Sequence, residues 1–282
     1  MKTWLEPARE IPVREYDVAI AGAGTGGVVA ALAAARSGAK TVLVESKGYV
    51  GGIAVEGGTA LHSFFNLWQP FPGVPKVQLV RGIPAEIVDR LIEAGGTYGH
   101  VETTGGVDYD SVCTSIDTEI YKHVAHTMLV EAGVDLWLNT VVVGAVTDGT
   151  RVTGMLVESR SGRELLRAAS FVDATGYGDL SAHAGARFTE PNDHPVANSM
   201  GVGGVDVERF AAWLRSIGAV EDYAETTLPD GRKQIVRITA KTAALPPALV
   251  AELRAIGMNL VTTAMRNDHF MFIKINVKTE ES

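Results

Sequence analysis

The chain has 282 residues, of which 46% are hydrophobic, and it carries a formal net charge of −8 and one cysteine. This size supports one large domain or two smaller ones with real cores. The acidic balance argues against a nucleic-acid surface, and one cysteine excludes an intrachain disulfide framework. No apolar run approaches the ~20 residues of a membrane span, and residues 1–17 show no signal peptide. These features are typical of a cytoplasmic enzyme.

The first predicted elements form a β-α-β unit. Residues 17–21 are a short apolar run, which is typical of a buried parallel strand. A glycine-rich turn at 22–27 leads into an alanine-rich helix over 28–37, and Gly38 ends it. Residues 41–45 predict a second buried strand. The connection between two such strands is right-handed as a rule.

The middle of the chain predicts loops, two helices and a β-meander. Residues 48–82 are rich in glycine and proline and predict loops over a ligand. The predicted helices cover 84–94 and 115–132, the predicted meander strands cover 135–147, 151–159 and 163–168, and a further buried strand covers 170–175.

The pattern of predicted elements changes after Gly176, which indicates a second domain. Residues 180–205 are expected to be irregular. Amphipathic helices are predicted over 206–217 and 246–256, and strands near 234–240, 258–265 and 269–277.

The glycine turn carries the chemistry, because it follows a strand and opens a helix. Gly22 permits a tight turn, Gly24 lets the backbone approach a pyrophosphate, and Gly27 lets the helix pack closely on the strand. The helix N-terminus offers N–H groups and a positive dipole end to phosphates. Glu45, at the end of the next strand, is placed to accept hydrogen bonds from ribose hydroxyls, so the unit predicts a dinucleotide site that disfavours NADP.

FAD and NAD share this unit, and the residues beyond Glu45 favour FAD. Gly51 and Gly52 open a stretch that also includes Gly57 and Gly58, and paired glycines let the backbone pass close to a pyrophosphate or a flat ring. A plain flexible loop is the alternative interpretation of these glycines.

Two segments carry a resemblance to a known family. The opening of the chain resembles FAD-dependent oxidoreductases with a glutathione-reductase-type FAD domain, on the residues Arg9-Glu10-Ile11-Pro12-Val13, Tyr16-Asp17-Val18, the glycine turn, Ala31, Gly38, Glu45 and Gly51-Gly52. The segment from Asp173 to Leu180 is similar to a second signature of that family, a strand ending in Ala-Thr-Gly beside the cofactor. Thr41 departs from the pattern, which usually has valine there. The resemblance spans residues 9–180 well and 181–282 faintly.

The resemblance implies an α/β fold with FAD as its cofactor. Residues 1–180 are expected to form a three-layer FAD/NAD(P)-binding, Rossmann-like domain with a β-meander and a loop-rich segment at 48–110. Residues 181–282 are expected to form an incomplete α+β substrate domain. The implied cofactor-binding residues are Gly22, Ala23, Gly24, Thr25, Gly26, Gly27, Glu45, Ser46, Lys47, Gly51, Gly52, Ile53, Val142, Ala174, Thr175, Gly176 and Asp179.

Other polar residues are candidates with a plainer alternative. His62 follows the glycine-rich loop, which the resemblance places near the flavin ring. A histidine there could donate or accept a proton, but a loop histidine bonded to backbone is the favoured alternative. His123 and His126 have a spacing that a metal can use, but a surface role is favoured and no metal is expected. Cys113 precedes a helix whose dipole could lower the pKa of the thiol and make it a redox partner of the flavin, but a lone cysteine is usually inert.

The predicted function is that of an FAD-dependent oxidoreductase, or of one chain of such an enzyme, which transfers a hydride from a small organic substrate to FAD. The alternatives are a non-redox nucleotide-binding subunit and a thiazole-synthase-like enzyme; the signature at residues 173–180 argues against the latter. Members of the family usually continue with a final strand and a Gly-Asp-type segment beside the flavin. We find no such segment, and we expect a second polypeptide to complete the fold, a truncated chain, or a partial function.

Overall fold

The structure is a computed structural model that describes residues 3, 7–56, 61–62, 78–105, 112–189, 196–264 and 270–277. Internal contacts divide the chain into two compact units, each built from two stretches. Unit 1 comprises residues 1–50 and 126–190, and unit 2 comprises residues 51–125 and 191–282. The long helix α3 (Thr118–Glu131) runs from one unit into the other. The domain boundary predicted near residue 180 stays a prediction.

Unit 1 is built on a six-stranded sheet in the order β7-β2-β1-β10-β9-β8. The strands are β1 (Val13–Ala21), β2 (Thr41–Val44), β7 (Asp135–Trp137), β8 (Val141–Asp148), β9 (Arg151–Ser159) and β10 (Gly162–Asp173). β7, β2, β1 and β10 pair in parallel, whereas β9 and β8 continue the sheet as an antiparallel arm. This mixed α/β sheet with its meander confirms the predicted fold class.

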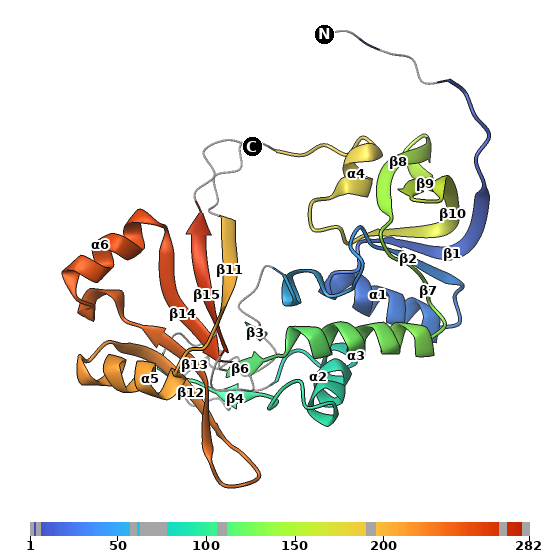
Figure 1. Cartoon of the computed structure of the whole chain (residues 1–282). Helices are drawn as coiled ribbons and strands as arrows, with labels where there is room; N and C mark the ends of the chain where they lie inside the picture. The colour runs from blue at the N-terminus through green and yellow to red at the C-terminus, as the bar shows by residue number, and fades with distance from the viewer. Residues whose placement is uncertain are drawn as a thin grey trace. The chain divides into compact units, whose positions relative to one another are not determined.

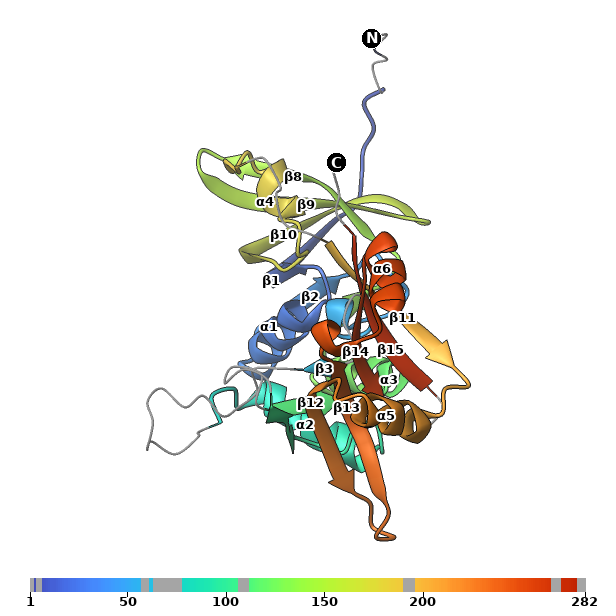
Figure 2. The same cartoon turned by 90° about the vertical axis from the view of Figure 1, so that its left-hand side faces the viewer.

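One helix and one arm cover the two faces of the parallel strands in unit 1. Helix α1 (Thr25–Arg36) lies on one face, and the β8–β9 arm and the short helix α4 (Asp179–His183) lie on the other (Figures 1 and 2). The core on the arm's face includes Ala19, Val42, Met155 and Leu166, all with 0% exposure. Residues 19–21 and 41–44 are all buried. Both faces of β2 and of the carboxyl end of β1 are therefore covered, as the apolar runs there predict.

The first meander strand predicted from the sequence is wrong, because residues 135–147 form two strands. Asn139 has a φ of 53° and interrupts the chain between β7 and β8. β7 joins the parallel sheet beside β2, and β8 pairs with β9. The two strands predicted at 163–168 and 170–175 are, conversely, the single strand β10.

Unit 2 contains a six-stranded sheet in the order β11-β15-β14-β13-β12-β5. Its strands are β5 (Thr104–Gly105), β11 (Val196–Gly203), β12 (Val220–Thr227), β13 (Lys233–Ala240), β14 (Met258–Ala264) and β15 (Phe270–Val277). Helices α5 (Val207–Ser216) and α6 (Pro247–Ala255) pack on one face of this sheet (Figure 1). Leu214, Ile235 and Ile238 lie in the core beneath them.

Unit 2 also contains shorter elements outside this sheet. They are the turn η1 (Gly52–Ala54), helix α2 (Ile83–Glu93) and a small sheet in the order β3-β6-β4, formed by Leu61–His62, Val112–Ser115 and Val101–Glu102. A further turn, η3 (Thr242–Ala244), joins β13 to α6. Residues 112–115 form β6, so α3 begins three residues later than predicted, at Thr118. No helix in the described ranges is long and apolar enough to cross a membrane.

Candidate cofactor site

Three chain segments of unit 1 meet at the carboxyl edge of its parallel strands. β1 ends at Ala21, and the next residue, Gly22, donates its N–H to the Val44 carbonyl at 2.8 Å. On the other side, the Ala174 N–H donates to the Ala21 carbonyl at 2.8 Å. The ends of β2 and β10 thus flank the glycine turn, at the edge where open α/β sheets bind ligands.

The glycine turn needs two of its glycines for packing alone. Gly22 has a φ of +89°, and a Cβ there would lie 2.5 Å from the Ala174 carbonyl oxygen. A Cβ on Gly27 would lie 1.8 Å from the Gly22 carbonyl oxygen. Gly26 differs, because a Cβ there would meet no atom within 4 Å. The turn is therefore tight on the side of the sheet and open beside the first turn of α1.

The amino end of α1 fits a phosphate group. Gly24 is the N-cap, and no side chain caps the helix there. The first turn also holds no acidic residue that would occupy the positive end of the helix dipole. The first-turn N–H groups of this 12-residue helix are therefore available to an anionic ligand.

Glu45 lies against the glycine turn. Its Oε2 accepts a hydrogen bond from the Ala23 N–H at 2.7 Å, and its Oε1 accepts one from the Lys47 N–H at 2.8 Å. The Ser46 hydroxyl donates to the same Oε1 at 3.0 Å. With 9% exposure, the residue is almost buried. Its carboxylate joins the end of β2 to the turn and still has lone pairs for a ligand hydroxyl.

The chain beyond Glu45 is paired with the segment after β7. The Thr140 N–H donates to the Glu45 carbonyl, and the Asn139 N–H donates to the Lys47 carbonyl, both at 2.9 Å. Asn139 has a left-handed conformation, and the chain continues from Thr140 into β8. Val142, one of the predicted cofactor-binding residues, lies near the start of β8 and packs on the core of unit 1.

Asp173 organises the loop after β10. Its Oδ1 accepts hydrogen bonds from the Thr175 hydroxyl at 2.8 Å and the Thr175 N–H at 3.2 Å. Its Oδ2 accepts one from the Ser181 N–H at 2.8 Å. The Thr175 hydroxyl in turn accepts from the Asp179 N–H at 3.0 Å. Burial alone would raise the pKa of Asp173, but the bonds from Ser181 and Thr175 outweigh it and lower the pKa below its ordinary value.

The structure brings the predicted residues of unit 1 together at one edge. The glycine turn, Glu45 with its two followers, and the loop from Ala174 to Asp179 are joined by the hydrogen bonds and close approaches described above. Gly51, Gly52 and Ile53 belong to unit 2. Gly51 has a φ of +127°, and a Cβ there would lie 2.8 Å from a Val55 methyl carbon, while Ile53 is exposed.

His62 lies in the two-residue strand β3, opposite Thr114 of β6, and its side chain lies outside what the structure describes. Its catalytic role stays a prediction. The paired exposed histidines His123 and His126 stand on α3, and the described residues contain no group of three His, Cys, Asp or Glu side chains that could hold a metal ion. Cys113 is buried.

Sequence reasoning missed the role of Asp173 and Ser181. An aspartate that bonds the backbone two residues on is a recognised turn pattern, so the Asp-Ala-Thr sequence carried a signal for part of this loop. The bond to Ser181 spans eight residues and depends on where α4 begins, which the sequence does not indicate.

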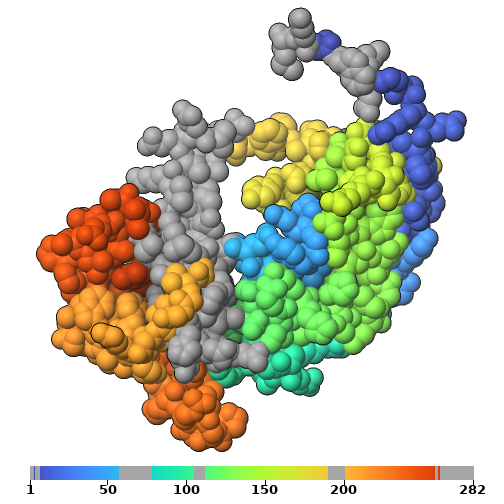
Figure 3. Space-filling view, viewed as in Figure 1, coloured from blue at the N-terminus to red at the C-terminus, as the bar shows by residue number. Residues whose placement is uncertain are grey.

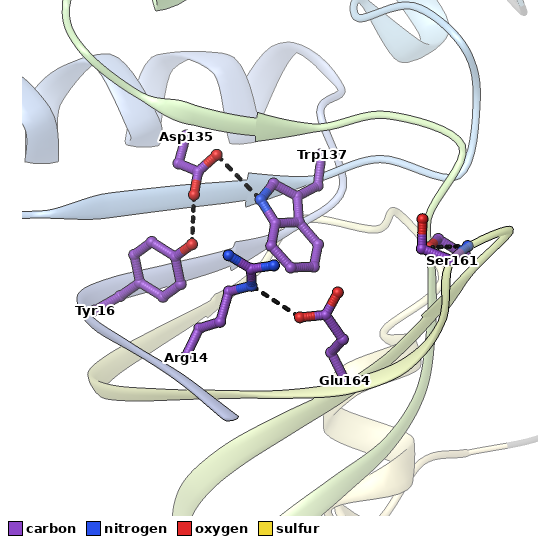
Figure 4. A network of polar contacts seen from close by, with 7 residues as sticks. Arg14, Tyr16, Asp135, Trp137, Ser161 and Glu164 are labelled. Atoms are coloured by element: carbon purple, nitrogen blue, oxygen red, sulfur yellow. Dashed lines mark hydrogen bonds and ion pairs between the residues drawn. The ribbon is translucent and has the colours of Figure 1, made fainter. Parts of the chain in front are cut away.

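A separate polar network ties three strands of unit 1 together (Figure 4). Arg14 donates to Glu164 at 2.8 Å, and its guanidinium lies 4.9 Å from the centre of the Trp137 ring. Asp135 accepts from the Tyr16 hydroxyl and from Trp137 Nε1. Burial and the Asp135 bond raise the pKa of Tyr16 above its ordinary value. These residues contact one another, so the network fixes β1, β7 and β10.

A family model described as FAD dependent oxidoreductase matches residues 17–270. The chain belongs to this family. The family prediction and the choice of FAD are therefore confirmed, whereas the glutathione-reductase-type subdivision stays a prediction. A search of curated proteins gave no match.

Several solved structures share the fold. The chain is similar to a geranylgeranyl bacteriochlorophyll reductase-like protein of Thermoplasma acidophilum, with a TM-score of 0.54 and 15% identity over 94% of this chain and 57% of the other. A myxobacterial chondrochloren halogenase, described as a variant of FAD-dependent halogenases, gives a TM-score of 0.57 and 16% identity over 94% and 53%. A flavin-dependent brominase gives 0.55 and 15% over 95% and 57%. The chain thus spans little more than half the length of these structures.

Proposed function

We propose that the protein is an FAD-dependent oxidoreductase, or one part of such an enzyme, which transfers a hydride from a small organic substrate to FAD. The observation that carries the proposal is the meeting of the glycine turn, Glu45 and the Asp173–Thr175 loop at one sheet edge. The family match supports the cofactor and the oxidoreductase class. The direction of transfer and the substrate belong to the proposal.

The residues of unit 1 have distinct roles in this proposal. The N–H groups at the start of α1 bind the diphosphate, and Gly26 leaves room for it. Glu45 accepts hydrogen bonds from the adenosine ribose while it holds Ala23 in place. Asp173 acts through the loop and keeps the backbone of Ala174 and Thr175 against the turn. Each contact orients the cofactor without any change in protonation.

Bound FAD supplies a two-electron acceptor for the hydride. The chain positions the substrate and takes up the proton that leaves with it. His62 is the candidate for the proton acceptor, from its place after the glycine-rich loop in the sequence. We place substrate binding in the sheet-containing part of unit 2 and the protein in the cytoplasm, the latter because the chain has a single cysteine.

The test begins with the purified protein. We expect its extracted ligand to have the mass of FAD and its visible spectrum to be that of oxidised flavin. Gly24→Val should abolish binding, because a branched side chain would fill the space of the pyrophosphate. Under anaerobic conditions, one member of a panel of small alcohols, amines and acids should bleach the flavin absorption. A nucleotide without a flavin in the extract would contradict the proposal and favour a non-redox nucleotide-binding subunit.

A further inference from the structure

Tyr177 is the most solvent-exposed large apolar or aromatic side chain in the described part of the chain. Its exposure is 92%, against 73% for Phe188, the next highest. It follows Thr175 and Gly176 directly, so it extends the segment that closes against the glycine turn. In the space-filling view, the yellow segment after β10 lies on the surface (Figure 3).

The backbone of the loop that carries Tyr177 is held in place by hydrogen bonds, whereas the tyrosine side chain is exposed. Gly176 and Gly178, on either side, have φ angles of +81° and +73°. The Asp173 carboxylate receives hydrogen bonds from both sides of the tyrosine, from Thr175 and from Ser181. The backbone is therefore organised in advance. A rigid aromatic side chain presented in this way supplies contact area at a small cost in conformational entropy.

The order of the strands indicates which half of a dinucleotide this loop would face. In the sheet, β2 and β10 lie on opposite sides of β1. Glu45, the proposed ribose acceptor, follows β2, and Tyr177 follows β10. With adenosine at Glu45 and the diphosphate at the start of α1, an extended cofactor continues on the side of β10. In FAD that second half carries a flat aromatic ring.

We propose that Tyr177 packs against the isoalloxazine ring of bound FAD. This inference rests on the proposed function and adds a positioning contact to it. An aromatic side chain stabilises the ring more than an aliphatic one of similar size. Offset-stacked aromatic pairs contribute binding energy in addition to that from the apolar area they bury. The contact also has an optical consequence: a tyrosine in contact with an excited flavin gives it an electron, which then returns, and the emission is quenched. Phenylalanine stacks but does not quench in this way.

The experiment uses the 282-residue protein freed of flavin and titrated with FAD. Tyr177→Leu should weaken FAD binding about two- to tenfold and brighten the bound flavin. Tyr177→Phe should keep the affinity and still brighten the flavin, and Tyr177→Trp should restore quenching. Binding of ADP, which lacks the ring, should be the same in all variants. Phe188→Leu, an exposed aromatic of the same unit outside the loop, is the matched control and should change neither readout.

Two results would overturn the role of Tyr177. One is equal flavin emission from the wild type, Tyr177→Phe and Tyr177→Leu. The other is a loss of ADP affinity in Tyr177→Leu as large as its loss of FAD affinity, which would place the ring on the adenosine half or show that the loop had been damaged. A wild-type protein that binds no FAD would contradict the proposed function itself, and the two failures are therefore distinguishable.

Discussion

Two adjacent glycines of the turn should respond to alanine in opposite ways. The Cβ of Gly27→Ala would lie 1.8 Å from the Gly22 carbonyl oxygen, so helix and strand must move apart. We expect a loss of about 3 kcal/mol or more in the free energy of unfolding. Gly26→Ala meets no atom within 4 Å, and stability should stay equal or rise by up to about 1 kcal/mol. Urea unfolding of the flavin-free proteins measures both, and equal losses would contradict the packing account.

Glu45 should matter for affinity through its charge. In Glu45→Gln, an amide replaces one of two oxygens that accept backbone N–H groups at 2.7 and 2.8 Å. Hydrogen bonds to a charged group contribute about 1.5–3 kcal/mol, so FAD binding should weaken roughly tenfold to hundredfold. Titration with FAD measures the change. Glu221→Gln, at an exposed position in unit 2, is the control, and a similar loss there would remove the assignment.

Asp173 should give the fold a measurable dependence on acid. Its pKa is lower in the folded state than in the unfolded chain, because bonds from Ser181 and Thr175 outweigh burial. Its stabilisation is therefore present above the unfolded pKa of about 3.9 and is lost as the pH falls through the lower folded value. The wild type should be more stable than Asp173→Asn near neutral pH, and the difference should shrink below pH of about 4. Urea unfolding from neutral to acid pH tests this, with Asp148→Asn at the exposed end of β8 as the control.

At the scale of elements, the break between β7 and β8 depends on one residue. Asn139 has a φ of 53°, a conformation that asparagine and glycine tolerate and β-branched residues do not. Asn139→Gly should be nearly neutral, whereas Asn139→Val should cost at least about 1–2 kcal/mol. Thermal unfolding of the two variants measures the difference. If valine is as stable as glycine, the left-handed turn is not required between the two strands.

The same break shows which elements the sequence could predict. β2 and the carboxyl end of β1 are buried and largely apolar. This pattern is local, so the sequence predicts the β-α-β unit within a few residues. A left-handed asparagine leaves no such pattern, and residues 135–147 look like one strand. β12 was missed for another reason: it carries Asp222, which looks solvent-exposed in sequence but is buried beside Arg237, with Nε–Oδ1 at 2.8 Å. The partner that makes this burial tolerable lies on the next strand.

The candidate site was predictable to a similar extent. The glycine turn and Glu45 are separated by one helix and one strand, so their meeting follows from the β-α-β unit. The return of β10 to the side of β1 needs the whole meander, and only the family resemblance indicated it. The exposure of Tyr177 follows from no local pattern, because it depends on which elements fail to cover the loop.

At the scale of the whole molecule, each unit has its own core. The core of unit 1 lies between the parallel strands and the β8–β9 arm, and that of unit 2 lies under α5 and α6. Both units are made of two stretches of chain. Removing residues 191–282 would therefore leave residues 51–125 without most of the strands of unit 2.

The last prediction concerns the outer edge of β10. Among the described residues, β9 pairs with β10 only over 162–167, while β1 pairs with it up to Asp173. Residues 168–173 thus have a strand neighbour on one side, and Ala169 and Ser170 are exposed. The faces of parallel sheets are normally covered by other elements. A strand edge without a neighbour also exposes backbone N–H and C=O groups, with which another strand can pair. We therefore predict that residues 1–282 alone either associate with another polypeptide through this edge or hold FAD weakly.

The measurement is the mass in solution and the flavin content after gel filtration. If association occurs at this edge, Ser170→Lys should reduce it, because a lysine on an exposed edge opposes strand addition. Thr150→Lys adds the same charge in the exposed β8–β9 turn and should leave the mass unchanged. A stable monomer of 29.9 kDa with stoichiometric FAD and turnover would show that this edge needs no partner strand. In that case the half-paired β10 is sufficient to support the flavin site.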